Sequence, residues 1–167
     1  MALLPILQFP DPRLKIKASP VINFDAELDI IIKDMFDTMY EQQGIGLAAT
    51  QVNIPLQIIV VDISTNKTEP MAMINPKIVT TIGSQLGLEG CLSFQGVYDK
   101  VTRAETIQVD FYNASGEKKS IKAHDLLSIC IQHEMDHLEG ITFYDHLSPL
   151  KQKRLRDKLE KIRRTAL

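Results

Sequence analysis

The chain has 167 residues, of which 44% are hydrophobic and 24% charged, and its formal net charge is −2. These values exclude an intrinsically disordered chain, and they exclude a protein that binds nucleic acid over its whole surface. A chain of this length can bury about two-thirds of its unfolded surface in one domain, so we expect a single folded domain.

The sequence carries no predicted membrane segment or secretion signal. Its apolar runs fall short of the roughly 18 residues that span a bilayer, and its apolar start lacks a basic region and is interrupted by Pro5 and Pro10. We therefore expect a cytoplasmic protein with no membrane and no DNA partner. In that reducing compartment, Cys91 and Cys130 are core residues, metal ligands or nucleophiles rather than a disulfide.

The first half of the chain predicts one helix followed by two strands. Asp25 is suited to cap a helix that runs to about Tyr40. The runs 57–64 and 71–79 are rich in β-forming residues, and Pro76 requires a bulge or a sheet edge in the second. The apolar positions that form one face of the helix are Leu28, Ile31, Met35 and Met39.

The second half predicts a hairpin and then a buried helix. Apolar and polar residues alternate between Glu105 and Tyr112, a turn follows at 113–116, and 118–123 forms the return strand. Residues 126–140 are apolar on most faces, which indicates a central buried helix. Gly140 suits the left-handed position just past its end.

Ser148 and Pro149 provide the cap and first turn of a last helix. Residues 151–167 hold eight lysines and arginines against two acids. We expect a catalytic domain at 1–147 with this basic helix, 148–167, attached to it. The order of elements predicts an α+β fold in which antiparallel sheets pack around the central helix. The apolar stripe of the last helix is Leu155, Leu159, Ile162 and Ala166.

The central helix carries the motif HEMDH, from His133 to His137. Residues four apart lie on one face of a helix, so both imidazoles can bind one metal ion. Glu134 is placed to contact a water at that metal rather than the metal itself. The alternative is a pair of core histidines bonded to backbone carbonyls. It is disfavoured because Glu134 and Asp136 would be costly in an apolar helix without a function.

Two histidines leave a metal site incomplete, and the usual downstream ligands do not fit. Gly140 matches the glycine of the metzincin pattern, but Phe143 stands where that pattern needs histidine. Glu139 is too close to His137, and Glu160 lies in the basic last helix. A third ligand has to come from another part of the chain.

Cysteine is the remaining choice of ligand. Cys91 lies between Gly87 and Gly90, which allow its backbone to approach another element closely. Cys130 lies three residues before His133 on the same helix face, so spacing alone does not exclude it. Its alternative role is that of a small buried apolar residue beside the site, which is the favoured one.

The segment from Gly44 to Gln51 is a further candidate. Its two glycines allow a strand or a ligand to approach, and the amide of Gln51 can donate hydrogen bonds. A phosphate-binding loop is the competing interpretation, but the lysine and the serine or threonine of such loops are absent.

Three motifs in this order resemble those of the bacterial peptide deformylases. They are GIGLAATQ (44–51), EGCLS (89–93) and QHEMDHLEG (132–140). The similarity also includes FPDPRL near the start and LSPLKQKR near the end, so it covers essentially the whole chain. This resemblance implies hydrolysis of the N-formyl group from formyl-methionyl nascent peptides, with release of formate.

The resemblance also implies a role for each site residue. Glu134 would be the general base and then the acid, while the Gln51 side-chain amide and the Leu92 backbone N–H would stabilise the oxyanion. The usual metal would be ferrous iron, which zinc, nickel or cobalt can replace. The metal ligands would be Cys91, His133 and His137, with water in the fourth position.

Substrate and partner contacts follow from the same resemblance. Backbone contacts to an extended peptide are implied for Ile45, Gly46 and Gly90, and a pocket for the methionine side chain is implied for Leu126, Ile129 and Cys130. On this basis Cys130 is a wall of the pocket. The basic C-terminal helix would bind the ribosome, and its affinity should fall steeply with salt.

Some positions depart from the family pattern. Phe94 and Gln95 stand where many members have an aliphatic residue and proline, and Thr102 replaces a frequent proline. Glu89 and Arg103 are expected to form an ion pair that braces the cysteine loop. Two other functions use the same residues: a metallopeptidase that cuts internal peptide bonds, and a non-catalytic ribosome-binding module with a structural metal.

Overall fold

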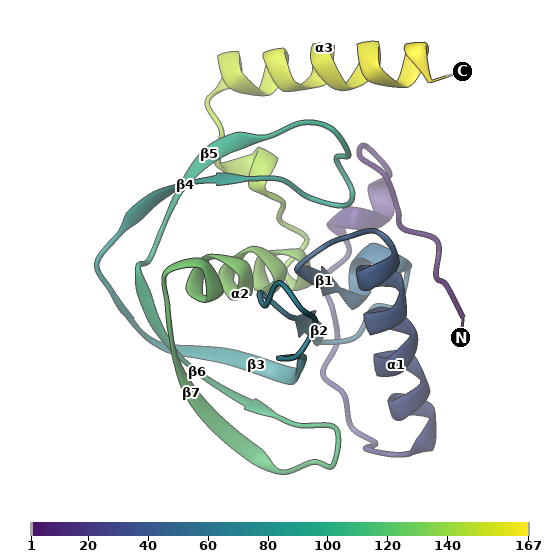
Figure 1. Ribbon diagram of the computed structural model, residues 1–167, viewed down its shortest axis with the longest axis vertical. Coiled ribbons are helices and arrows are strands. Elements are labelled where there is room, and N and C mark those ends of the chain that lie inside the picture. Colours follow the sequence, from purple (N-terminus) through teal and green to yellow (C-terminus); the bar gives the residue numbers. More distant parts are fainter. Residues whose placement is uncertain (1, 167) are drawn as a thin grey trace.

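The computed structural model describes residues 2–166, which form three α-helices, three short 3-10 segments and two antiparallel sheets (Figure 1). Among these residues, no helix combines the length and the apolar character needed to cross a membrane. The helices are α1 (Ala26–Glu41), α2 (Asp125–Leu138) and α3 (Pro149–Thr165), and the 3-10 segments are Pro12–Lys15, Ala49–Val52 and Phe143–His146.

The larger sheet has the strand order β1-β2-β3-β6-β7, and the smaller one pairs β4 with β5. In chain order the strands of the larger sheet are β1 (Gly46–Ala48), β2 (Ile58–Val61), β3 (Met71–Ile82), β6 (Thr106–Tyr112) and β7 (Lys118–His124). The smaller sheet consists of β4 (Gln85–Glu89) and β5 (Asp99–Arg103). The predicted α+β class is confirmed.

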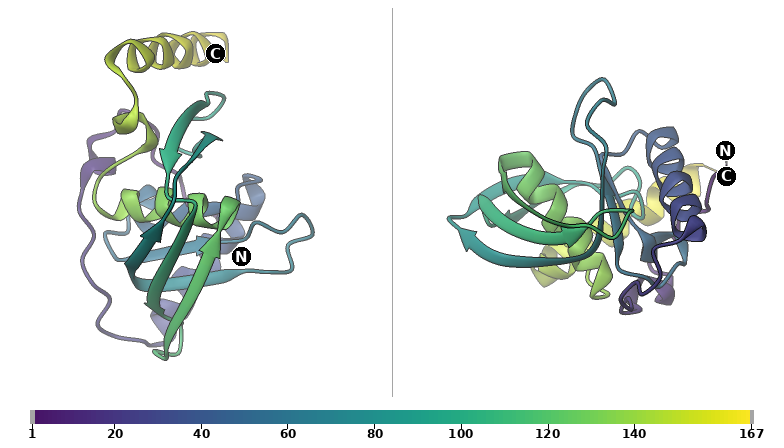
Figure 2. Two further views of the ribbon diagram at one scale, coloured as in Figure 1. Left: turned by 90° about the vertical axis from the view of Figure 1, so that its left-hand side faces the viewer. Right: turned by 90° about the horizontal axis from the view of Figure 1, so that it is seen from below.

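Strand β2 lies between two helices, which explains its unbroken apolar sequence. Ile58 and Val60 belong to the core that α1 covers, while Ile59 and Val61 belong to the core that α2 covers. Successive residues of a strand face opposite sides, so both faces of β2 must be apolar. Figures 1 and 2 show α1 and α2 on opposite sides of β1 and β2. The sheet thus holds α2 in the middle of the molecule.

Helix α2 ends as the sequence predicts. Its last residue is Leu138, and Gly140 has a φ of 76°. A side chain at Gly140 would also collide with the carbonyl oxygen of Lys15, because an added Cβ would lie too close to that atom. Glycine therefore meets two requirements here, a left-handed conformation and close contact with the N-terminal segment.

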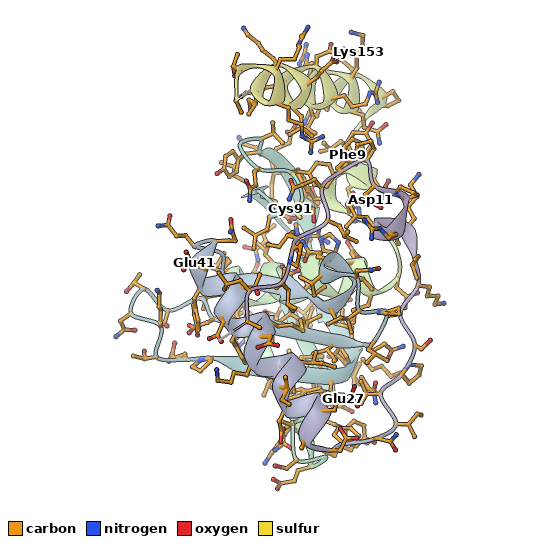
Figure 3. The ribbon with its side chains drawn as sticks, turned by 90° about the vertical axis from the view of Figure 1, so that its right-hand side faces the viewer. Phe9, Asp11, Glu27, Glu41, Cys91 and Lys153 are labelled. Atoms are coloured by element: carbon orange, nitrogen blue, oxygen red, sulfur yellow. The ribbon has the colours of Figure 1, made fainter. Side chains whose placement is uncertain are left out.

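A third core, called the aromatic core here because the rings of Phe9, Phe94, Phe143 and Tyr144 pack in it, joins the smaller sheet to α3. Phe94 is fully buried, and its ring centroid lies 4.7 Å from that of Phe9 and 5.0 Å from that of Phe143. Helix α3 places Leu155 and Leu159 in this core. Its charged side chains, such as Lys153, lie on the outer side (Figure 3).

Several local predictions need correction. In α1, Ile32 is buried and Ile31 only partly so, because the helix face is rotated slightly toward the sheet. Ala166 is exposed and lies past the end of α3. Strand β2 is shorter than the predicted range 57–64. The bulge expected at Pro76 is confirmed by a register shift between Ile74 and Lys77.

Candidate metal centre and active site

The structure brings one thiol and two imidazoles together. Cys91 lies just after β4, whereas His133 and His137 lie one turn apart on α2. The ligand atoms of these three residues lie within 4.8 Å of one another, and Cys91 Sγ is 3.4 Å from His137 Nε2. The thiol of Cys130 points elsewhere and contacts the carbonyl oxygen of Ile45 at 3.6 Å. The geometry thus favours Cys91 over Cys130 as the third ligand.

A buried ion pair orients the first imidazole. Glu89 Oε1 lies 2.8 Å from His133 Nδ1, and Arg103 donates to both carboxylate oxygens of Glu89 at 2.6 and 2.9 Å. We assign the Nδ1 proton of His133 to this contact, which leaves Nε2 free to bind a metal. The Glu89–Arg103 pair predicted from the sequence is confirmed, and it links the strand before Cys91 to the helix that carries the histidines.

Burial and nearby charge set the protonation of the two imidazoles. Burial lowers the pKa of His137 well below its usual value, and the positive charge of His133 lowers it further. His137 therefore presents a neutral ring, the form that binds metals. Burial also lowers the pKa of His133, but the negative charge of Glu134 and hydrogen bonds to Cys91 and Glu89 outweigh burial and raise the pKa well above its usual value. The groups around His133 therefore favour binding of a cation between the Cys91 thiol and the two imidazoles.

Glu134 lies in the same buried environment. Burial raises the pKa of Glu134 to about 7, although the positive charges of His133 and Arg103 oppose the rise. Within residues 2–166, the Oε1 atom of Glu134 is buried without a hydrogen-bond partner. Such an atom is costly unless something else satisfies it. A bound cation with its water would do so, and the thiolate and two imidazoles are suitable donors for one.

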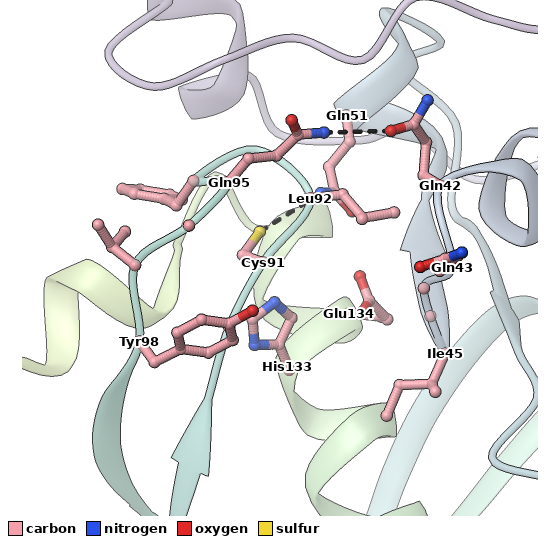
Figure 4. Close-up of a pocket in the computed structure, with 16 residues that line it drawn as sticks. Gln42, Gln43, Ile45, Gln51, Cys91, Leu92, Gln95, Tyr98, His133 and Glu134 are labelled. Atoms are coloured by element: carbon pink, nitrogen blue, oxygen red, sulfur yellow. Dashed lines mark hydrogen bonds between the residues drawn. The ribbon is translucent and has the colours of Figure 1, made fainter. Parts of the chain in front are cut away.

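These groups line a cavity of about 490 Å³ that opens to the surface (Figure 4). Its lining includes Cys91, His133 and Glu134, whereas His137 is fully buried and does not line the cavity. Of the other predicted site residues, the lining includes Gln51, Leu92, Ile45, Gly46 and Gly90. The lining does not include Leu126, Ile129 or Cys130. These three residues lie about one to two turns before His133 on α2.

Gln51 is held in one orientation. Its Oε1 atom accepts a hydrogen bond from the backbone N–H of Ala48 at 2.9 Å. The amide nitrogen therefore faces the site, where it lies 3.5 Å from Cys91 Sγ and 3.1 Å from Ser93 Oγ. Ser93 is fully buried, and the sequence alone gave no reason to assign it this contact.

Gly46 allows β1 to pass close to the catalytic face of α2. A Cβ added at Gly46 would lie 2.5 Å from Glu134 Oε2 and 2.8 Å from Cys130 Sγ. Any larger residue would displace the carboxylate or the strand, so the expected close approach at this glycine is found.

The comparisons with known proteins agree with this geometry. A family model described as polypeptide deformylase matches residues 3–153. The chain belongs to the peptide deformylase family. It is 52% identical over 161 residues to the peptide deformylase of Pseudoalteromonas translucida, with 96% of each chain covered. It is also 52% identical over 171 residues to that of Xylella fastidiosa M12, with 99% of each covered.

Solved deformylase structures show the same fold. A peptide deformylase from Legionella pneumophila superposes with a TM-score of 0.96 at 45% identity, covering 99% of this chain and 98% of the other. The chain is a metal-dependent hydrolase with a Cys-His-His site typical of deformylases.

The residues that depart from the family pattern have distinct positions in this deformylase. Phe94 is fully buried in the aromatic core. Gln95 is exposed at the mouth of the cavity, where its amide nitrogen donates to Gln42 Oε1 at 3.2 Å. Figure 4 shows this contact between opposite sides of the opening, with Gln43 and Tyr98 also on the rim. Long-range contacts such as Gln42–Gln95 leave no pattern in a single sequence.

Proposed function

We propose that the cavity removes the formyl group from N-formylmethionyl nascent peptides. The observation that supports this most strongly is the convergence of Cys91, His133 and His137 beside the buried carboxylate of Glu134. Membership of the deformylase family gives the reaction, and the open cavity gives access for a chain terminus.

We assign the metal to Cys91, His133 and His137, with ferrous iron as the physiological ion and zinc, nickel or cobalt as substitutes. When bound, such an ion lowers the pKa of its water to about 7 and polarises a carbonyl. Anaerobic purification with metal analysis tests this assignment. Formate release that is lost in air and restored by nickel would support a ferrous site, whereas activity insensitive to air would contradict it.

Glu134 is proposed to transfer the proton, and Gln51 and Leu92 to stabilise the developing negative charge. Water adds to the formyl carbon and gives a proton to Glu134 Oε1, which has no other hydrogen-bond partner within residues 2–166. The carbonyl oxygen becomes negative, and we assign the Gln51 amide and the Leu92 N–H as its hydrogen-bond donors. Glu134 then passes the proton to the amine as the C–N bond breaks, and formate leaves. Loss of one such oxyanion donor typically costs about 2.7 to 4 kcal/mol.

The substrate backbone is proposed to add to the free edge of β1. This strand is the terminal one of the larger sheet, and Ile45, Gly46 and Gly90 line the cavity beside it. Main-chain hydrogen bonds would serve peptides of any sequence. The methionine side chain would be held by Leu126, Ile129 and Cys130, on the part of α2 next to the cavity.

Two assays separate this function from a metallopeptidase. The metal-loaded protein should release formate from a formyl-methionyl tripeptide and leave an unformylated protein intact. Cleavage of internal peptide bonds without formate release would contradict the proposal. A non-catalytic metal module would show neither activity.

We further propose that residues 1–147 form the catalytic domain and that α3 docks on the ribosome, in the cytoplasm where nascent chains emerge. Seven of the eight cations of α3 are exposed. An exposed row of cations suits ribosomal RNA, because neutralising phosphates releases counterions.

A further inference from the structure

A chain of polar contacts runs from the metal centre to the partly exposed side chains of Asp136 and His146. His133 contacts Glu89, and Glu89 is paired with Arg103. The third nitrogen of that guanidinium, Nη1, donates to Asp136 Oδ2 at 2.8 Å. The same oxygen lies 2.8 Å from His146 Nε2. Five side chains from α2, β4, β5 and the 3-10 segment before α3 are thus connected in series.

The outer end of this chain is more open than its inner end. The side chains of Glu89 and Arg103 are 3% and 4% exposed, whereas those of Asp136 and His146 are 25% and 40% exposed. Asp136 and His146 line a second cleft of about 800 Å³, together with Arg103. This cleft and the active-site cavity share no lining residue, so the two are separate.

We propose that His146 is a positioning residue for the metal centre and acts through Asp136 and Arg103. Asp136 receives two hydrogen bonds at one oxygen, one from inside and one from the surface. His146 thereby holds the carboxylate against Arg103 instead of leaving it free to turn toward the open cleft. Arg103 in turn keeps both oxygens of Glu89 in place, and so fixes the ring of His133.

The positioning role of His146 should be measurable as the rate at which the site releases its metal. Groups that contact a ligand directly typically contribute about 10- to 100-fold to metal affinity. His146 acts from three links beyond such a group, so His146→Leu should release the metal about two- to fivefold faster. Asp136→Asn, one link nearer, should have a larger effect. Since both act along one path, His146→Leu should add little in the Asp136→Asn background.

The test uses the cobalt-loaded protein. Metal release to a chelator and the visible absorption of the bound cobalt are measured for wild type, His146→Leu and His146→Gln. Glutamine retains an N–H donor near the position of Nε2, and it should restore both the release rate and the spectrum. His124→Leu is the matched control, because His124 is an exposed histidine whose hydrogen bond goes to Thr106.

The inference rests on the proposed metal centre, and the two can fail separately. If the wild-type protein retains no cobalt, the metal assignment itself is wrong. If wild type retains cobalt but His146→Leu releases it at the wild-type rate, His146 has no positioning role. Equal acceleration by His124→Leu, or failure of His146→Gln to restore the rate, would also overturn the inference.

Discussion

Helices α2 and α3 both carry many charged residues, but they hold these charges in opposite ways. On α2, His133 and Asp136 belong to a largely buried network that also includes Arg103 of β5. On α3 the lysines and arginines are mostly exposed, and contacts such as Lys153–Asp157 lie on the surface. Charge inside the protein has fixed partners and sets the geometry of a site, whereas charge on α3 remains available to another molecule.

The aromatic core separates these two regions. Phe143 lies against the ring of His133, with centroids 6.0 Å apart, and also contacts Phe94. Arg163 of α3 donates to the carbonyl oxygen of Phe9 at 2.5 Å. Both helices therefore pack against the same aromatic core, although their charged residues have different roles.

The largest expected effect is on catalysis by α2. Glu134→Gln should lower kcat for formate release by about 10² to 10⁴, the usual contribution of a general acid–base group. Metal content, measured by elemental analysis, should be unchanged, because Glu134 is not among the three metal donors. Glu160→Gln, an exposed glutamate on α3, is the control and should keep full activity. Equal losses in both variants would remove the distinction between the helices.

The next effect concerns stability. Arg103→Ala leaves the buried Glu89 without its guanidinium partner, with only the His133 contact, and should lower the free energy of unfolding by about 3 to 5 kcal/mol. Lys153→Ala breaks an exposed pair on α3 and should cost less than about 0.5 kcal/mol. Denaturant unfolding of both variants measures this difference. If Arg103→Ala costs no more than Lys153→Ala, the buried pair does not brace the site.

A third prediction concerns the availability of charge on α3. Replacing the exposed residues Lys158, Lys161 and Arg164 with glutamine should weaken ribosome binding. It should also flatten the plot of log affinity against log salt by about two to three units of slope. Formate release from a short peptide should not change. An unaltered slope would show that these cations do not contact phosphates.

The smallest effect lies outside both regions, at the buried residue Asp62. Burial raises the pKa of Asp62, but hydrogen bonds from Ser64 and Tyr40 outweigh burial and lower it. Because the folded pKa is below the unfolded value, the stabilisation is present above about pH 3.9 and is lost as pH falls through the folded pKa. Asp62→Asn should cost about 1 kcal/mol at pH 7 and less at pH 3. A cost independent of pH would contradict the assigned contacts.

The sequence predicted the parts of the molecule that depend on local pattern. The helix with HEMDH, its end at Gly140 and the β6–β7 hairpin follow from spacing and turn residues. Strands β4 and β5 were not predicted, because the apolar residues of β4, Leu86 and Leu88, are 64% and 67% exposed. In β4 the apolar side chains are thus exposed while the charged Glu89 is buried, so a hydrophobic pattern does not identify its buried face.

The sequence predicted only those parts of the site that lie in recognisable motifs. Spacing alone could pair His133 with His137, but the choice of Cys91 over Cys130 needed the family resemblance. The contacts of Ser93, Asp136 and His146 join segments distant in the chain. Such contacts depend on how the sheets and α2 pack, which no local pattern encodes.

The central claim is that a thiol from the loop after β4 and two imidazoles of α2 share one cation. X-ray absorption at the metal edge of the zinc-loaded protein tests it most directly. We predict one sulfur neighbour at about 2.3 Å and two nitrogen neighbours at about 2.0 to 2.1 Å, with the sulfur signal lost in Cys91→Ser and kept in Cys130→Ser. A spectrum without sulfur, or one that loses sulfur in Cys130→Ser instead, would contradict the assignment.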